Sequence, residues 1–118
     1  MKMADKNHQK IERKIIQEVV KILVEKAQPD LIIQFGSSLS RDFGADSDLD
    51  LIIIEAKSPQ LPDNRVEALY QLYLSLSQIP LAKDLLLYSR EEFERFKDSK
   101  NHIISQALKK GKILYGRL

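Results

Sequence analysis

Residues 31–35, Leu-Ile-Ile-Gln-Phe, lead into Gly36-Ser37, and Asp48-Leu49-Asp50 leads into Leu-Ile-Ile-Ile at residues 51–54. Ten residues separate the Gly-Ser pair from the Asp-Leu-Asp sequence. Short apolar runs bounded by turn residues are typical of buried strands. The pattern therefore predicts a strand, a polar turn and a second strand, with acidic groups where the second strand begins.

The predicted turn after the first strand has the composition of an anion site. Gly36 can adopt backbone conformations closed to other residues and lets a ligand approach the main chain. Ser37 offers a hydroxyl and a backbone N–H, and residues 38–40 could begin a short helix whose free N–H groups favour an anion. On its own, a Gly-Ser pair is more typical of a plain polar turn between strands.

The two aspartates that begin the second strand are predicted to share one face. Side chains alternate along a strand, so Asp48 and Asp50 point the same way with Cα atoms roughly 6.5 Å apart. Carboxylates at that spacing can share one or two Mg²⁺ ions, together with substrate phosphates. A solvated strand end or a helix cap is the alternative, although carboxylates entering a buried strand are costly unless paired or metal-bound.

Together, Gly36-Ser37 and Asp48-Leu49-Asp50 resemble the signature of the DNA polymerase β-like nucleotidyltransferase superfamily. The short chain and the run Ser47-Asp48-Leu49-Asp50-Leu51 are most similar to its minimal (MNT-type) members, which are often the antitoxins of HEPN/MNT toxin–antitoxin pairs. The resemblance covers about residues 31–116. Leu39 and Arg41 stand where many members carry a small residue and a glycine.

The family pattern also has a third carboxylate, on a later strand preceded by a helix. Residues 79–88, Ile-Pro-Leu-Ala-Lys-Asp-Leu-Leu-Leu-Tyr, fit that description with Asp84 as the acid. Lys83 precedes it where an apolar residue is commoner in the family. Taken alone, Asp84 is a charge within an apolar run, and a partly exposed strand position neutralised by Lys83 is the alternative.

The resemblance implies two Mg²⁺ ions, one activating an acceptor hydroxyl and one stabilising the leaving pyrophosphate of ATP. It also implies that the Gly-Ser turn holds the β- and γ-phosphates. A loop arginine at position 41 either neutralises phosphate charge or is merely solvated. The expected site residues are Asp48, Asp50 and Asp84 as catalytic residues and metal ligands, and Gly36, Ser37 and Arg41 as nucleotide-binding residues.

The implied reaction is transfer of AMP from ATP to a tyrosine of a partner HEPN ribonuclease toxin. The chain has no room for a separate acceptor domain, so a partner protein or a small molecule in an open cleft would supply the second substrate. A hetero-oligomer or a homodimer is expected for that reason. The alternatives are a non-catalytic antitoxin that masks its partner and a small-molecule adenylyltransferase, against which the missing acceptor domain argues.

Length and composition limit the remaining classes. The 118 residues are expected to form one domain, residues 1–118. With no cysteine, disulfides and thiolate metal sites are excluded, and a cytoplasmic location is expected. No apolar run approaches the ~18 residues of a membrane helix, and the N-terminus lacks the apolar core of a signal peptide. A net charge of +2 gives no argument for nucleic-acid binding.

The other elements follow from periodicity and capping signals. In residues 64–78 the expected apolar stripe is Val66, Leu69, Tyr70, Tyr73 and Leu76, with both tyrosines in the core. We expect helices at about 6–26 (capped by Asp5), 64–78, 90–97 (after a capping box that starts at Ser89) and 101–110, a loop at 56–63 and a short extended tail at 112–116. This order predicts an α/β (α+β) fold, with helices packed on a small mixed sheet.

Overall fold

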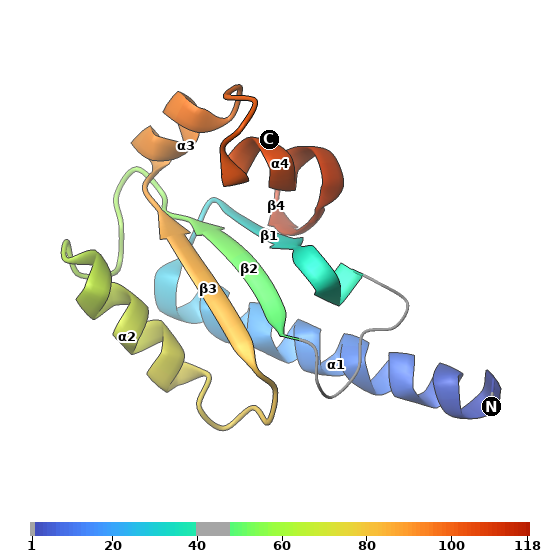
Figure 1. The fold of residues 1–118 in the computed structure, drawn as a ribbon. Coiled ribbons are helices and arrows are strands. Elements are labelled where there is room, and N and C mark those ends of the chain that lie inside the picture. Colours follow the sequence, from blue (N-terminus) through green and yellow to red (C-terminus); the bar gives the residue numbers. More distant parts are fainter. Residues whose placement is uncertain (1, 40–47) are drawn as a thin grey trace.

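The computed structural model describes residues 2–39 and 48–118, with side chains from residue 13 onward. It consists of a four-stranded sheet with helices on both faces (Figure 1). In chain order the elements are α1 (Lys2–Ala27), β1 (Leu31–Phe35), the 3-10 helix η1 (Gly36–Leu39), β2 (Leu49–Ile54), α2 (Arg65–Ser75), β3 (Lys83–Tyr88), α3 (Arg90–Phe96), α4 (Ile103–Lys110) and β4 (Lys112–Gly116).

The sheet is mixed, with strand order β3-β2-β1-β4. Strand β1 runs antiparallel to both β2 and β4, whereas β2 and β3 are parallel. The predicted α/β class and mixed sheet are therefore confirmed. Residues 112–116, predicted only as an extended tail, pair with β1 as an edge strand.

Two apolar clusters fill the spaces on either side of the sheet. Alternate residues of β2 explain the division, because Leu51 and Ile53 belong to one cluster while Ile52 and Ile54 belong to the other. Helices α1 and α2 cover the first face, and α3 and α4 cover the second (Figure 1). Strand β2 therefore contributes residues to both clusters. Each fully buried Leu or Ile among them stabilises the fold by about 1.5–3 kcal/mol.

Helix α1 is longer than the sequence pattern predicted. It begins at Lys2 rather than near Lys6, so the prediction that Asp5 caps it is wrong. At its other end it stops at Ala27, and Gln28 takes a positive φ of 44° before the first strand. Among the residues that the structure describes, α1 and the other helices include none with the length and apolar character needed to cross a membrane.

Helix α2 buries only part of the predicted stripe, since Leu76 is fully buried and Leu69 packs partly buried against the core. Its buried positions are Ala68 and Leu72, whereas Val66 is 78% and Tyr70 is 58% exposed. Ala68 and Leu72 are four residues apart and therefore lie on the same side of the helix, which is the side turned to the core. The prediction that Tyr70 belongs to the core is wrong, and Tyr73 is 37% exposed.

Caps determine where the shorter helices begin. The Ser89 hydroxyl accepts the N–H of Glu92 at 3.0 Å, and the Glu92 carboxylate accepts the N–H of Ser89 at 2.8 Å, so the predicted capping box is confirmed. Helix α4 starts at Ile103 rather than at residue 101, because Nδ1 of His102 accepts the N–H of Ile104 at 3.1 Å and caps it.

Candidate functional site

The sheet topology brings the predicted site residues to one edge. Strand β1 ends where β2 begins because the two are antiparallel, and Phe35 pairs with Asp50. Strand β3 begins at the same edge because it is parallel to β2, and Asp84 pairs directly with Asp50. The glycine turn after β1 and the acids of β2 and β3 therefore lie at the same edge of the sheet.

Gly36 lies against the carboxylate of Asp50. Its φ is +76°, a left-handed conformation that glycine tolerates and other residues rarely adopt. A Cβ built on Gly36 would overlap Oδ2 of Asp50 and lie 3.3 Å from its Cγ. The glycine is thus required twice, by the backbone and by the acid packed on it.

The three acids interact electrostatically. Partial burial raises the pKa of Asp50 above its usual range, and the nearby negative charges of Asp84 and then Asp48 raise it further. Asp48 and Asp84 are exposed, while Asp50 is half-buried. Asp48 directly precedes β2 rather than lying within it. Negative charges that raise the pKa of a nearby carboxyl group in this way favour the binding of a cation.

The backbone aligns the acids, but their side chains are not gathered around a single point. Within residues 13–39 and 48–118, no three acidic, histidine or cysteine side chains are arranged as ligands of one metal ion. The donor set nevertheless suits Mg²⁺, which takes carboxylate oxygens and keeps part of its shell for water and phosphate. Asp50, Asp84 and Asp48 are the residues that could hold it, with their side chains rearranged around the ion.

Two buried polar residues hold the glycine turn, and the motif search did not identify them. Nε2 of Gln34 donates to the carbonyl of Ser38 at 3.2 Å and to its Oγ at 3.0 Å. The Ser38 hydroxyl donates to the carbonyl of Phe35 at 3.3 Å. A glutamine within the apolar run 31–35 was the available signal, because a buried polar side chain needs a nearby partner. The short helix expected to begin at residues 38–40 starts earlier, as η1 over Gly36–Leu39, so that it includes the Gly-Ser pair.

Lys83 does not neutralise Asp84. Its ammonium donates to the carbonyls of Ile79 and Leu81, both at 2.8 Å. Burial lowers the pKa of Lys83. The alternative in which Asp84 is a strand charge balanced by its neighbour is therefore not supported, and Asp84 remains exposed at the site edge.

Two of the three predicted nucleotide-binding residues, Gly36 and Ser37, lie within the described part of the chain. Gly36 and Ser37 are exposed at the edge where the acids converge. Arg41 lies outside the described residues, so its predicted role remains a prediction.

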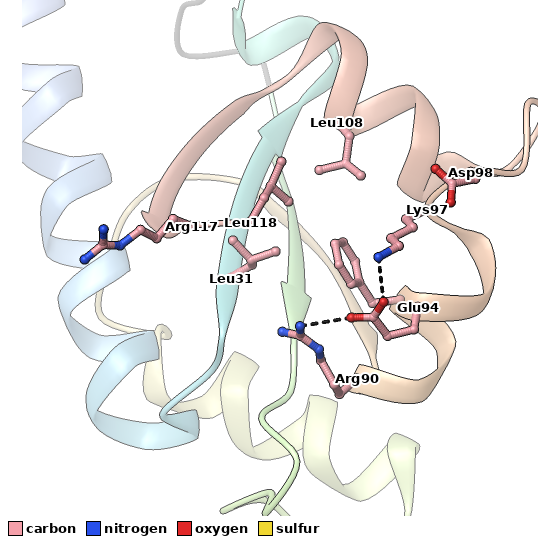
Figure 2. Close-up of a pocket in the computed structure, with 9 residues that line it drawn as sticks. Leu31, Arg90, Glu94, Lys97, Asp98, Leu108, Arg117 and Leu118 are labelled. Atoms are coloured by element: carbon pink, nitrogen blue, oxygen red, sulfur yellow. Dashed lines mark ion pairs between the residues drawn. The ribbon is translucent and has the colours of Figure 1, made fainter.

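A hollow at the other end of the sheet does not involve the acids. It has a volume of about 310 Å³ and lies where β1 begins, next to Leu31 (Figure 2). Three of its charged side chains are already paired: Glu94 contacts Arg90 at 2.9 Å and Lys97 at 2.6 Å, and Arg90 also contacts Asp30 outside the hollow at 2.8 Å. Internal pairing leaves little net charge to attract a ligand, so the acidic edge is the stronger candidate.

The comparisons with known proteins bear on the family and the fold of the chain. Residues 17–117 match the family model described as polymerase beta, nucleotidyltransferase. A crystal structure of a toxin–antitoxin with AMP-PNP superimposes with a TM-score of 0.59 at 21% sequence identity, covering 86% of this chain and 73% of that chain. At that identity the likeness concerns the fold. A search of curated proteins found no match.

Proposed function

The chain belongs to the polymerase beta nucleotidyltransferase family, and we propose that it is a Mg²⁺-dependent enzyme that transfers AMP from ATP to a hydroxyl group of a partner protein. The observation that carries the proposal is the position of Asp50. It lies opposite Asp84 in the strand register and its carboxylate lies against Gly36. Its pKa is raised by burial and then by its acidic neighbours. In a metal-bound triphosphate, the metal ion would balance the negative charge of these acids, and the phosphates would bind at the glycine turn.

Each residue has a role that its place in the fold supports. Asp48 and Asp50 would hold both ions, and Asp84 would complete the shell of the ion on the acceptor side. Mg²⁺ bound there would activate the acceptor and stabilise the leaving group. Exposed backbone and hydroxyl groups of Gly36 and Ser37 would hold the β- and γ-phosphates, beyond the bond that breaks.

The reaction is an in-line displacement at the α-phosphorus of ATP. The acceptor oxygen forms a bond to that phosphorus, and the bond to the β-phosphate oxygen breaks to release pyrophosphate. The hydroxyl proton passes to Asp84 or to water beside it. Because the chain forms no covalent intermediate in this scheme, its contribution is positioning and charge neutralisation.

An exposed site favours a macromolecular acceptor. Asp48, Asp84 and Gly36 are all exposed at the sheet edge, so a surface of another protein can reach them. We propose that this protein is a toxin, and specifically a HEPN ribonuclease modified on tyrosine. The superimposed crystal structure is of a toxin–antitoxin, which supports the first part of that proposal. The chain would act as a single-domain antitoxin in the cytoplasm, where ATP is available.

A second candidate function is a binding module that silences its partner by masking it. The exposed apolar side chains on α2 favour this alternative, because Val66, Tyr70 and Leu74 are each more than half exposed. Isolated exposed apolar residues are ordinary, but several on one helix are typical of contact surfaces. A masking protein would keep its effect after the acids were removed, which separates the two functions.

Intact-mass spectrometry tests the proposed function. We expect the protein encoded beside this one to gain one or more AMP units when both are incubated with ATP and Mg²⁺. The matched control is the double variant Asp48→Asn/Asp50→Asn, which should give no gain. A complex that forms equally with wild type and control, without any mass change, would establish masking instead.

A further inference from the structure

Asp84 lies on the outermost strand of the sheet. Strand β3 pairs with β2 on one side and has no strand on the other, among the described residues. Edge strands have unpaired backbone groups and open more readily than central ones. The distance between Asp84 and Asp50 therefore depends on the contacts that other parts of the chain make with the outer side of β3.

A tyrosine hydroxyl takes the place of the missing neighbour strand. The N–H of Leu85 donates to the hydroxyl oxygen of Tyr73 at 2.8 Å, although the two residues are twelve apart in sequence. That N–H belongs to the peptide bond that joins Asp84 to Leu85. The phenol of α2 thus fixes the backbone directly after the acid.

A lysine fixes the backbone directly before the acid. The Lys83 ammonium donates to the carbonyls of Ile79 and Leu81 at 2.8 Å each, which closes the loop that leads into β3. On the inner side, the N–H of Leu49 donates to the carbonyl of Ala82 at 2.8 Å. The first residues of β3 are therefore held from the loop as well as from β2.

We propose that Tyr73 and Lys83 are positioning residues that hold Asp84 opposite Asp50, so that the two carboxylates can share a divalent cation. The inference rests on the proposed function, since it assigns these contacts a purpose in the same site. Neither residue contacts a reacting atom. Both act through the backbone on either side of Asp84, and a displacement of about 1 Å from reactive geometry can cost 10²-fold in rate.

Five variants separate positioning from simple stabilisation. Tyr73→Phe removes only the hydroxyl, and Lys83→Met removes only the charge and the donors. Tyr70→Phe, on the same helix but 58% exposed, and Lys57→Met, in an exposed loop, are the matched controls. Lys83→Arg keeps donors at the same position and should restore part of the lost function.

The first readout is binding of Mn²⁺, measured by electron paramagnetic resonance in the presence of AMP-PNP. We expect Tyr73→Phe and Lys83→Met each to weaken Mn²⁺ binding by about 10-fold, because losing a hydrogen bond that orients a metal ligand lowers metal affinity. Neither control should change it. The second readout is hydrogen exchange at the Leu85 amide, which should become several-fold faster in Tyr73→Phe while core amides of β2 stay protected.

The outcomes distinguish this inference from the proposed function. If Asp84→Asn weakens Mn²⁺ binding but Tyr73→Phe and Lys83→Met bind like wild type, the two contacts are structural and the positioning role is refuted, with the proposed function intact. If wild type itself binds no Mn²⁺, both fail. Weaker binding in the two variants, with unchanged melting temperatures and partial rescue by Lys83→Arg, supports the positioning role.

Discussion

Asp50→Asn is expected to abolish AMP transfer while leaving the fold intact. Asp50 lies opposite Asp84 in the strand register and is the acid whose pKa both other acids help to raise, so its loss removes a ligand from the expected metal site. A bound ion supplies several kcal/mol of transition-state stabilisation, and each 1.36 kcal/mol is tenfold in rate, so a loss of about 10³-fold is expected. Single-turnover transfer to the partner, followed by mass spectrometry, measures it.

The stability of the same variant provides the internal control. The folded-state pKa of Asp50 is raised above its usual value of 3.8, chiefly by burial, so its charged form opposes folding. The favourable contribution of the protonated form is present below pH 3.8 and is lost as the pH rises through the raised pKa. Asp50→Asn should therefore melt no lower than wild type at pH 7, and the difference should shrink at pH 4.

Two results would contradict this interpretation of Asp50. Transfer within about tenfold of wild type would remove Asp50 from the metal site, because a lost ligand costs far more than that. A melting temperature well below that of wild type at pH 7 would show instead that the carboxylate stabilises the fold. Lys57→Met, remote in an exposed loop, controls for preparation effects.

Gly36→Ala is expected to damage both transfer and stability. The added Cβ would occupy a left-handed backbone position and overlap Oδ2 of Asp50. Left-handed geometry costs a non-glycine residue about 1–2 kcal/mol, which for a domain of this size lowers the melting temperature by roughly 3–8 °C. Transfer should fall by about 10²-fold, because Asp50 and the phosphates are both displaced from reactive geometry.

Ser37→Ala is the matched control for that substitution. It removes a hydroxyl from the adjacent residue without changing the backbone, so nucleotide affinity should fall less and the melting temperature should not move. Calorimetric titration with AMP-PNP, combined with thermal unfolding of each variant, measures both effects. Wild-type nucleotide affinity in Gly36→Ala would show that the turn does not hold phosphates.

The sequence predicted the central part of the fold because its signals there are local. Two apolar runs joined by a glycine turn specify β1 and β2, and the capping box at Ser89 specifies the start of α3. The buried face of α2 was predicted only in part, because the expected stripe included Leu76 and Leu69, which lie in or against the core, but also Tyr70, which is 58% exposed. Helical periodicity shows that a helix is amphipathic, but the tertiary packing decides whether Ala68 or Tyr70 is buried.

In the candidate site, too, only the residues with local sequence signals could be predicted from the residues themselves. The spacing of Gly36 and Asp50 placed them at one edge, and the structure brings them into contact. Asp84 needed the family resemblance, because periodicity alone does not give the parallel register that pairs it with Asp50. The contact of Gln34 with Ser38 is local, and the glutamine within the apolar run was its only signal. The contact of Tyr73 with Leu85 depends on tertiary packing, and no local pattern identifies it.

Calorimetric titration of AMP-PNP with and without Mg²⁺, on wild type and on Asp48→Asn/Asp50→Asn, tests most directly whether the glycine turn and the acids form one metal–triphosphate site. We expect wild type to bind the nucleotide at least about tenfold more tightly with Mg²⁺, and the double variant to lose that gain while remaining folded. Equal affinity with and without Mg²⁺ in wild type, or an undiminished Mg²⁺ effect in the double variant, would contradict the assignment.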